Sequence, residues 1–376
     1  MTYKYYMPTK IFCGEDSIFS HSHELKKLGK KAMLVTGKTS AKRNGSLHDV
    51  IKALDKEGID YIIFDKVMTN PTIACAYEGA KFAKINHIDF IITIGGGSPM
   101  DAAKAMALLA KQDIKEGDLF NGQYTNEVLP IVAIPTTAGT GAEVTQYSIL
   151  TNDKVENKTS IASELIFPKL AFIDEKYMMR LPVTTTINTA IDALSHAIEG
   201  MLSTRSSIIS DTLAKECIRL FIKSAPILCQ ARMENKSNII NATTRYNLIQ
   251  SAMLAGVVIA QTGTTAVHAM GYSLTYFKHI DHGRANGLLL SAYMNFVKKQ
   301  DPQLIANILN TMGMTQLNDF QNLLNQLLGH RENITQEDIV KYSKKAVLTG
   351  NIQYNCKVKP SQQDVYDIFM KVFNVD

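Results

Sequence analysis

Short apolar runs rich in β-branched residues alternate with helix-like segments through the first half of the chain. The runs predict buried strands, and they lie at Ala32–Val35, Tyr61–Phe64, Phe90–Ile94, Ile131–Ile134 and Leu170–Ile173. The periodicity of residues 46–57, 72–86 and 98–111, which separate the first four runs, predicts helices. Alternating strands and helices are typical of a parallel sheet covered by helices. Ligands of such a sheet bind beyond the carboxyl ends of its strands.

The pattern changes after Pro182, where helical periodicity continues almost without interruption over residues 184–376. Only Asn351–Lys359 has the character of an irregular connection. We therefore expect two domains, an α/β domain with a Rossmann-like parallel sheet over residues 1–182 and an all-α domain over residues 183–376. Because the boundary is a shift in composition rather than a flexible linker, the expected site is a cleft that faces both domains.

The sequence IGGGSPMDAAK, residues 94–104, joins a predicted strand to a predicted helix. Ser98 is expected to cap this helix and Pro99 to lie in its first turn. Bare backbone amides at a helix N-terminus bind phosphate, because the N–H groups and the helix dipole both favour an anion. The spacing matches neither Gly-x-Gly-x-x-Gly nor a Walker-type Gly-Lys-Ser. The glycines therefore form either a phosphate-binding turn or a tight turn without a ligand.

Composition narrows the class of protein. With 376 residues, 45% of them apolar and 20% charged, the chain has the balance of a soluble globular protein. The net charge of +5 includes no long basic run, which argues against a nucleic-acid partner. The five cysteines form no Cys-x-x-Cys pair, a usage typical of free thiols in the cytoplasm. The N-terminus has no apolar signal region, and the longest apolar stretch, near Met253–Ala260, is too short to span a membrane.

Asp192 and His196 lie one helical turn apart in AIDALSHAIEG, residues 190–200. Such a pair either ligates a metal or belongs to a solvent-facing stripe of the helix. That stripe would consist of Asn188, Asp192, Ser195, His196 and Glu199.

Three further histidines, His268, His279 and His282, lie in the otherwise apolar and aromatic segment HAMGYSLTYFKHIDHG, residues 268–283. Two of them, with Asp192 and His196, would form a set of three imidazoles and one carboxylate. This donor set suits Fe²⁺ or Zn²⁺ and is too rich in nitrogen for Mg²⁺ or Ca²⁺.

Four motifs follow one another along the chain, namely GGGSPMDAAK, PTTAGTGAEVT at residues 135–145, DALSHAIEG at residues 192–200, and HAMGYSLTYFKHIDHG. In this order they resemble the iron-dependent, or group III, alcohol dehydrogenases, and among these the NADP-using alcohol and 1,3-propanediol dehydrogenase-like members. The resemblance covers essentially the whole chain and implies a dehydroquinate synthase-like architecture. The family's metal ligands are an Asp, a His one helical turn later, and two His fourteen positions apart. Carried over, they imply a catalytic metal centre of Asp192, His196, His268 and His282, with His279 outside it.

The same resemblance implies that the glycine turn cradles the pyrophosphate of a nicotinamide dinucleotide. Gly95, Gly96, Gly97 and Ser98 would approach the two phosphates, and Asp101 would lie near the nicotinamide ribose. The family's other cofactor-contacting positions match Thr136, Thr137, Thr140 and Lys158.

The segment LVTGKTSAKR, residues 34–43, bears on the choice of cofactor. In doubly wound sheets an acidic residue after this strand holds the ribose 2′-hydroxyl and repels a 2′-phosphate, but here the position is Gly37. The following residues offer donors and positive charge suited to a phosphate, and they are Lys38, Thr39, Ser40, Lys42 and Arg43. We therefore expect Gly37, Lys38 and Ser40 to contact the cofactor and NADP(H) to be preferred over NAD(H). The alternative is a glycine turn followed by a solvated basic loop.

The resemblance implies a metal-dependent oxidoreductase that transfers hydride between NAD(P) and an alcohol/aldehyde pair, with a short-chain primary alcohol or a diol as substrate. The metal would polarise the substrate oxygen, and the cofactor would carry the redox step. The family favours Fe²⁺, although the donors also suit Zn²⁺ and Ni²⁺. It also suggests a cytoplasmic homodimer.

Other proteins of similar architecture are alternatives. A glycerol dehydrogenase-like zinc polyol dehydrogenase would use three protein ligands, so His196 argues against it. Dehydroquinate synthase, a lyase, has Glu as first ligand and needs basic residues near the metal, which the stretch around Asp192 lacks. A scaffold-only binding protein without activity would have no need of all four ligands and the complete glycine turn.

The chain departs from the family pattern at two places. Ala190-Ile191 stands where many members have Gly-Met, which changes helix packing more than chemistry. Tyr272 stands where many members carry an additional His. An aromatic wall is favoured over a proton-passing phenol, because a Tyr pKa near ~10 suits proton relay poorly at neutral pH.

Overall fold

The computed structural model describes residues 2–329 and 332–373, and its contacts divide the chain into two compact units. One unit is Met7–Arg180, and the other joins the first six residues to Leu181–Asp376. The division falls near the boundary expected at residue 182. Leu181 belongs with the helices because its carbonyl accepts a hydrogen bond from Arg245 Nη2 at 3.1 Å. Tyr6 belongs there because its backbone N–H and C=O pair with the side-chain amide of Gln261.

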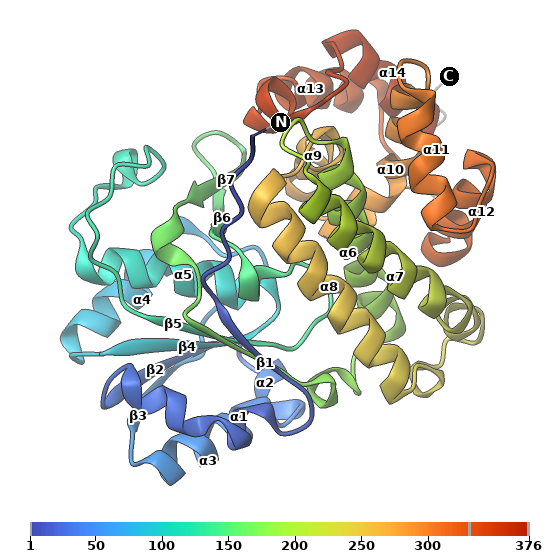
Figure 1. Ribbon diagram of the computed structural model, residues 1–376. Coiled ribbons are helices and arrows are strands. Elements are labelled where there is room, and N and C mark those ends of the chain that lie inside the picture. The colour runs from blue at the N-terminus through green and yellow to red at the C-terminus, as the bar shows by residue number, and fades with distance from the viewer. Residues whose placement is uncertain (1, 330–331, 374–376) are drawn as a thin grey trace. The chain divides into compact units, whose positions relative to one another are not determined.

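A parallel sheet forms the middle of the unit Met7–Arg180 (Figure 1). The strands of this unit are β1 (Lys10–Cys13), β2 (Lys31–Thr36), β3 (Asp60–Phe64), β4 (Phe90–Gly95), β5 (Ile131–Pro135), β6 (Tyr147–Asn152), β7 (Asn157–Ala162) and β8 (Leu170–Ile173). Among the described residues the sheet has six strands in the order β1-β8-β5-β4-β2-β3, and its pairs are parallel. β6 and β7 form a separate antiparallel hairpin. The five apolar runs correspond to β2, β3, β4, β5 and β8. The sequence did not predict β1, which is short, or the hairpin, which is largely polar.

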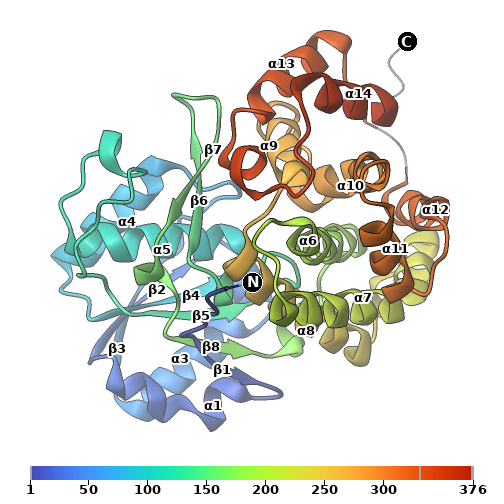
Figure 2. The same ribbon diagram turned by 45° about the horizontal axis from the view of Figure 1, so that its top comes forward.

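Helices cover both faces of the sheet. The helices of this unit are α1 (Ser17–Ser20), α2 (Ser40–Arg43), α3 (Ser46–Glu57), α4 (Ile73–Ile85) and α5 (Gly97–Lys111). Met33 and Val35 of β2 pack into the core that contains α4 and α5, whereas Ala32 and Leu34 pack into the core that contains α3. Figures 1 and 2 show α4 and α5 on one side of the sheet and α1 and α3 on the other. Because successive side chains point to opposite faces, a strand covered on both is a continuous apolar run.

Helix α5 begins at Gly97, and the predicted capping role of Ser98 is wrong. The residue before the helix is Gly96, and Ser98 is the second residue of α5. The Ser98 hydroxyl oxygen instead accepts a hydrogen bond from the backbone N–H of Asn70 at 3.3 Å. Pro99 lies in the first turn as predicted, where a missing N–H costs no helical hydrogen bond.

The second unit is helical, as predicted, and its helices are labelled in Figure 2. They are α6 (Val183–Leu202), α7 (Ile208–Glu234), α8 (Ala242–Thr262), α9 (Ala266–Lys278), α10 (His282–Lys298), α11 (Pro302–Thr311), α12 (Leu317–Leu328), α13 (Gln336–Ala346) and α14 (Gln362–Phe373). α6 is buried along most of its length, because α7, α8 and α10 pack around it. The expected irregular connection contains one π-helical turn, Asn351–Asn355. Within the described residues no single helix meets the length and apolarity needed to cross a membrane, and the bent pair α8 and α9 meets them only jointly.

Candidate active site

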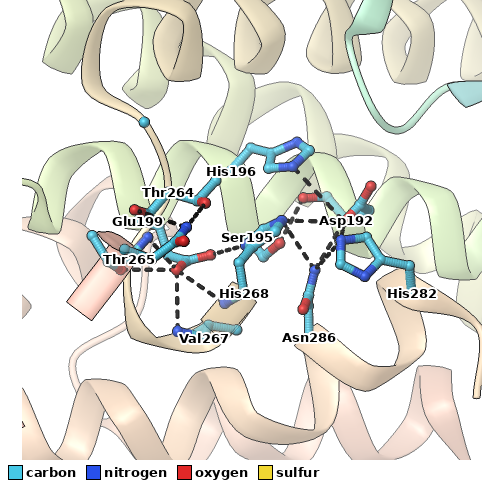
Figure 3. Close-up of polar contacts among 12 residues, drawn as sticks. Asp192, Ser195, His196, Glu199, Thr264, Thr265, Val267, His268, His282 and Asn286 are labelled. Atoms are coloured by element: carbon cyan, nitrogen blue, oxygen red, sulfur yellow. Dashed lines mark hydrogen bonds and ion pairs between the residues drawn. The ribbon is translucent and has the colours of Figure 1, made fainter. Parts of the chain in front are cut away.

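Helices α6, α9 and α10 bring the four predicted metal ligands together (Figure 3). Asp192 and His196 lie on α6, His268 lies in the first turn of α9, and His282 is the first residue of α10. Asp192, His196 and His268 are buried, and one ligand atom from each lies within 4.8 Å of the others. His282 is partly exposed, so one side of the group is reached from outside.

The distances around Asp192 fit a bound metal ion. Its Oδ1 lies 3.9 Å from Nε2 of His196, 3.7 Å from Nε2 of His268 and 3.8 Å from Nε2 of His282. In a tetrahedral site with bonds of about 2.1–2.3 Å, neighbouring ligand atoms lie about 3.4–3.8 Å apart. One carboxylate with three imidazoles suits Fe²⁺ or Zn²⁺ better than Mg²⁺ or Ca²⁺. The residues therefore fit a transition-metal ion.

Asn286, on α10, indicates where the ligand lone pairs point. Its Nδ2 lies 3.0 Å from Asp192 Oδ1, 3.1 Å from His268 Nε2 and 3.3 Å from His282 Nε2. An amide nitrogen has two hydrogens to donate and no lone pair to accept, so the three atoms compete for two N–H groups at one point. A cation needs the same convergence. The sequence analysis did not single out Asn286, because an asparagine four residues after a histidine carries no metal-binding signal by itself.

Two glycines allow the three helices to come this close. A Cβ on Gly283 of α10 would lie 1.8 Å from the Asn188 carbonyl oxygen of α6. A Cβ on Gly271 of α9 would lie 2.2 Å from Asn286 Oδ1. Both distances are far inside van der Waals contact, so a side chain at Gly283 would push α6 and α10 apart, and one at Gly271 would displace the Asn286 side chain. The motif at residues 268–283 therefore provides both the histidines and the glycines that let their helices pack closely.

Glu199, on α6, holds His268 from the side opposite the ligand group. Its carboxylate is fully buried, and Oε2 is hydrogen-bonded to Nδ1 of His268. Oε1 accepts hydrogen bonds from the backbone N–H groups of Thr265 at 2.8 Å, Val267 at 3.1 Å and His268 at 3.3 Å. These N–H groups belong to the N-terminus of α9, where the helix dipole also favours an anion.

Burial and the imidazoles act in opposite directions on the two carboxylates. Burial raises the pKa of Asp192, but His196, His282 and His268 outweigh it, and the net pKa is lowered. Burial also raises the pKa of Glu199, yet the charge of a protonated His268 and the hydrogen bonds from His268 and Thr265 leave that pKa lowered as well. Both groups are therefore ionised at neutral pH, and Asp192 can balance the charge of a cation.

The interpretation of α6 as a helix with a solvent-facing stripe is wrong. All members of that stripe are buried, namely Asn188, Asp192, Ser195, His196 and Glu199. Periodicity showed that they share a face, but which face is covered depends on α9 and α10.

The remaining aromatic and imidazole side chains of the motif are also placed. His279 is exposed and ends α9 with φ 54°. The Tyr272 ring stacks on the His282 ring, with centroids 5.7 Å apart and planes 12° apart. Tyr272 thus lines the His282 side of the ligand group, the position of an aromatic wall.

The unit Met7–Arg180 gathers predicted cofactor residues at the carboxyl ends of three strands. Gly37 follows β2, Gly95 ends β4, and Thr136 follows β5. β2 pairs with β4 and β4 with β5, and the Thr136 N–H donates to the Gly95 carbonyl at 2.9 Å. These three segments therefore lie side by side at one edge of the sheet, where ligands of doubly wound sheets bind.

The glycine turn packs tightly against the segment after β5. A Cβ on Gly96 would lie 2.8 Å from Thr137 Oγ1, and one on Gly97 would lie 2.7 Å from Thr140 Cγ2. A side chain at either glycine would therefore displace a threonine side chain, in addition to any conflict with a bound phosphate.

Lys104 and Asp101 are buried polar groups on α5. Lys104 Nζ donates to Thr145 O at 2.8 Å, Thr145 Oγ1 at 3.1 Å and Tyr147 O at 2.9 Å. Burial lowers the pKa of Lys104 and raises the pKa of Asp101, while Lys104 and more weakly Lys158 act against that rise. Lys158 lies in β7 opposite Thr151, and its positive charge lowers the pKa of Asp101. The sequence analysis did not single out Lys104, which ties α5 to the start of β6 and the residues before it.

The loop after β2 carries less unpaired positive charge than its sequence suggests. Lys42 forms an ion pair of 2.8 Å with Asp65, which follows the neighbouring strand β3. Lys38 and Ser40 are exposed. A Cβ on Gly37 would have the Val67 carbonyl oxygen, at 3.3 Å, as its nearest neighbour. A side chain at this position would therefore need only a small adjustment.

Comparison with known proteins identifies the class to which this fold and site belong. The family model for iron-containing alcohol dehydrogenase matches residues 8–175, and the C-terminal model of the Fe-containing alcohol dehydrogenase family matches residues 186–373. The chain is 34% identical to a 1,3-propanediol dehydrogenase of Citrobacter freundii over 317 residues, which are 83% of this chain and 79% of that protein. It is 37% identical to the solved iron-containing alcohol dehydrogenase of Thermotoga maritima, with a TM-score of 0.91 and full coverage of both chains.

The chain belongs to the iron-containing alcohol dehydrogenase family. It is an alcohol oxidoreductase, and alcohols or aldehydes are its class of substrate. Relatives of similar identity differ in their cofactor. The NADPH-dependent butanol dehydrogenase of Clostridium saccharobutylicum is 32% identical over 310 residues, 81% of this chain and 76% of that protein. The NADH-dependent butanol dehydrogenase B of Clostridium acetobutylicum is 30% identical over 304 residues, 80% of this chain and 76% of that protein.

Proposed function

We propose that the protein is an iron-dependent alcohol dehydrogenase that prefers NADP(H) and interconverts short-chain primary alcohols or diols with their aldehydes. The observation that carries the proposal is the convergence of ligand atoms from Asp192, His196, His268 and His282, with Oδ1 of Asp192 3.7–3.9 Å from the three Nε2 atoms. When bound, a divalent cation would polarise the substrate oxygen while the nicotinamide accepts or donates the hydride.

The side chains around this point have separate tasks in the proposal. Asp192 contributes the negative charge, and the imidazoles of His196, His268 and His282 contribute neutral donors. The Tyr272 ring, stacked on His282, limits the space beside the reacting carbon and excludes water.

The unit Met7–Arg180 would bind the dinucleotide at the carboxyl edge of its sheet. The proposed contacts are Gly37, Lys38, Ser40, Gly95, Gly96, Gly97, Ser98, Asp101, Thr136, Thr137, Thr140 and Lys158. The N-terminus of α5 would hold the pyrophosphate, since helix N-termini favour anions. The lack of an acidic side chain at Gly37 supports NADP(H), whereas the pairing of Lys42 with Asp65 leaves Lys38 and Arg43 as the proposed phosphate donors.

The test is to purify the protein without chelator, measure its metals, and reconstitute it with Fe²⁺ under anaerobic conditions. About one Fe or Zn per chain is expected. Ethanol, butanol, 1,3-propanediol, glycerol and the matching aldehydes are then assayed with NADP(H) and NAD(H). Highest kcat/KM on glycerol with zinc would instead support a polyol dehydrogenase, against which His196 argues as a fourth ligand. Absence of both metal and turnover would leave a scaffold-only protein.

We further propose a homodimer in the cytoplasm, with no nucleic-acid or membrane partner. The chain has five cysteines and no Cys-x-x-Cys pair, a usage that suits a reducing compartment. Light scattering should give a mass twice that of the 41.6 kDa chain, and a monomer mass would contradict the dimer.

His268→Ala is expected to lose metal and activity together while the protein stays folded, because the sheet does not depend on this side chain. Metal content, turnover and circular dichroism are measured on the same sample. The matched control is His279→Asn, at an exposed histidine of the same motif whose positive φ asparagine tolerates. A His268→Ala variant with stoichiometric metal and normal turnover would contradict the assignment of His268 as a metal ligand.

A further inference from the structure

Glu199 is a charged side chain that the proposed reaction does not use, yet it is fully buried on α6. An ionised carboxylate in the interior costs several kcal/mol unless its hydrogen bonds are satisfied. Here Oε1 receives the N–H groups of Thr265, Val267 and His268 and also the hydroxyl of Thr265, at 2.8 Å. Oε2 faces Nδ1 of His268, as Figure 3 shows.

This arrangement determines which nitrogen of His268 carries the proton. The carboxylate has only acceptor atoms, so Nδ1 must be the donor in the contact with Oε2. A neutral imidazole with its proton on Nδ1 has its lone pair on Nε2. That Nε2 lies 3.7 Å from Asp192 Oδ1 and 3.1 Å from Asn286 Nδ2. The free lone pair therefore points to the ligand group.

We propose that Glu199 is a positioning residue that selects the Nδ1–H tautomer of His268 and so presents Nε2 to the metal. The same carboxylate binds the first N–H groups of α9, so one side chain holds both the tautomer of the ligand and the helix that carries it. The inference rests on the proposed metal-dependent function. Outer carboxylates of this kind commonly orient metal-bound histidines.

Glu199→Gln separates the tautomer from the size of the side chain. The glutamine oxygen must face the four donors at the start of α9, because an NH₂ group there would oppose them. Its NH₂ group is then forced toward Nδ1 of His268, which must become an acceptor. The proton moves to Nε2, and the lone pair that the metal needs is lost. A nearly isosteric change should therefore weaken metal binding.

Metal affinity is measured by competition titration of metal-free protein with Zn²⁺ and Co²⁺. We expect the dissociation constants of Glu199→Gln to rise 10- to 100-fold. Nitrogen-15 NMR of histidine-labelled, metal-free protein at pH 8 should show His268 with the proton on Nδ1 in the wild type and on Nε2 in the variant. The His268 signal is assigned from its absence in His268→Gln.

Thr265→Val is the matched control, because it removes one hydrogen bond to Oε1 and leaves the contact of Oε2 with His268 intact. It should lower the melting temperature yet change the metal dissociation constant less than threefold and leave the tautomer unchanged. A metal affinity of Glu199→Gln equal to that of the wild type overturns the inference while the proposed function stands. If the wild type binds no metal, the proposed function fails and the positioning role with it. If Glu199→Gln does not fold, the wild-type spectrum decides, since a proton on Nε2 there contradicts the proposal.

Discussion

Gly37 and Gly96 both lie at the carboxyl edge of the sheet, yet their surroundings differ. A Cβ on Gly37 would lie 3.3 Å from Val67 O, whereas one on Gly96 would lie 2.8 Å from Thr137 Oγ1. The first contact needs a shift of a few tenths of an ångström, and the second requires a side chain to move away. A substitution at Gly37 therefore tests the effect of charge beside the cofactor, and a substitution at Gly96 tests the effect of packing against Thr137.

Gly37→Asp should greatly reduce the preference for NADP(H). The wild type is expected to favour NADPH over NADH by tenfold or more in kcat/KM, about 1.4 kcal/mol. The aspartate should remove most of this margin because it repels a 2′-phosphate and binds a 2′-hydroxyl. Gly37→Ala controls for the added Cβ and should keep the preference. If the wild type uses NADH equally well, Gly37 has no role in the choice of cofactor and serves only as a turn residue.

Gly96→Val should weaken cofactor binding at least tenfold, about 1.4 kcal/mol, without changing metal content. A valine side chain here would crowd a bound pyrophosphate and the helix that the turn opens. The structure shows that Thr137, a proposed cofactor contact, is displaced first. Fluorescence titration with NADPH measures the effect, and Gly117→Val, at a glycine with open space around its Cβ position, is the control. An unaltered titration would leave the turn as part of the fold only.

At the level of elements, buried polar groups fix α5 to the chain that follows β5. Lys104 donates to Thr145 and Tyr147, and Ser148 Oγ donates to the Asp101 carbonyl at 2.6 Å. Glu143, in the 3₁₀ turn between β5 and β6, is also buried, and within the described residues its Oε1 has no hydrogen-bond partner. Burial raises the pKa of Glu143 from 4.5 to about 7. An unsatisfied buried carboxylate of this kind lowers stability when it ionises.

The pH dependence of the free energy of unfolding tests whether ionisation of the Glu143 carboxyl destabilises the folded protein. Between pH 4.5 and 7 the folded state binds more protons at Glu143 than the unfolded state does, so the free energy of unfolding falls as pH rises through this window. The loss is on the order of 3 kcal/mol and is complete above about pH 7. Glu143→Gln, neutral at every pH, should therefore be more stable than the wild type at pH 8 and nearly equal to it at pH 4.5.

Urea unfolding at both pH values measures the difference, and Glu127→Gln, at an exposed glutamate of the same unit, is the control. A difference between Glu143→Gln and wild type that does not change with pH would show that the carboxylate is not the cause.

On the scale of the whole molecule, the proposed metal ion and the proposed dinucleotide bind to different units. The four proposed metal ligands belong to the unit that contains Leu181–Asp376, and the proposed dinucleotide contacts belong to Met7–Arg180. A ligand stabilises the state that binds it by about 2.7 kcal/mol at 100 times its dissociation constant. Metal and cofactor should therefore protect different parts of the chain.

Hydrogen exchange with mass spectrometry measures this protection. Addition of Fe²⁺ or Zn²⁺ to metal-free protein should slow exchange in α6, α9 and α10, and a chelator should reverse it. NADP⁺ should instead slow exchange in the segments after β2, β4 and β5. Equal protection of the sheet by the metal would contradict a metal site held by the helices alone.

The sequence by itself determined the local structure and the chemistry of the donor set. β2, β4 and β5 were predictable because a strand covered on both faces must be apolar throughout. The four proposed metal ligands could be named because Asp192 and His196 share a helix face, while the resemblance supplied His268 and His282. By contrast, β1 and the hairpin were missed, since strands this short or polar have little signal of their own.

Only the tertiary structure decided which faces are covered and which groups meet. The polar face of α6 was open to two interpretations, and packing against α9 and α10 buried it. Glu199 faces Nδ1 of His268, and Thr137 lies against Gly96. Lys42, which follows β2, forms an ion pair with Asp65, which follows β3. Each of these contacts joins segments far apart in the chain. The periodicity of a single segment specifies the faces of a helix or strand, but the atoms that meet those faces come from other segments, and only folding brings them into contact.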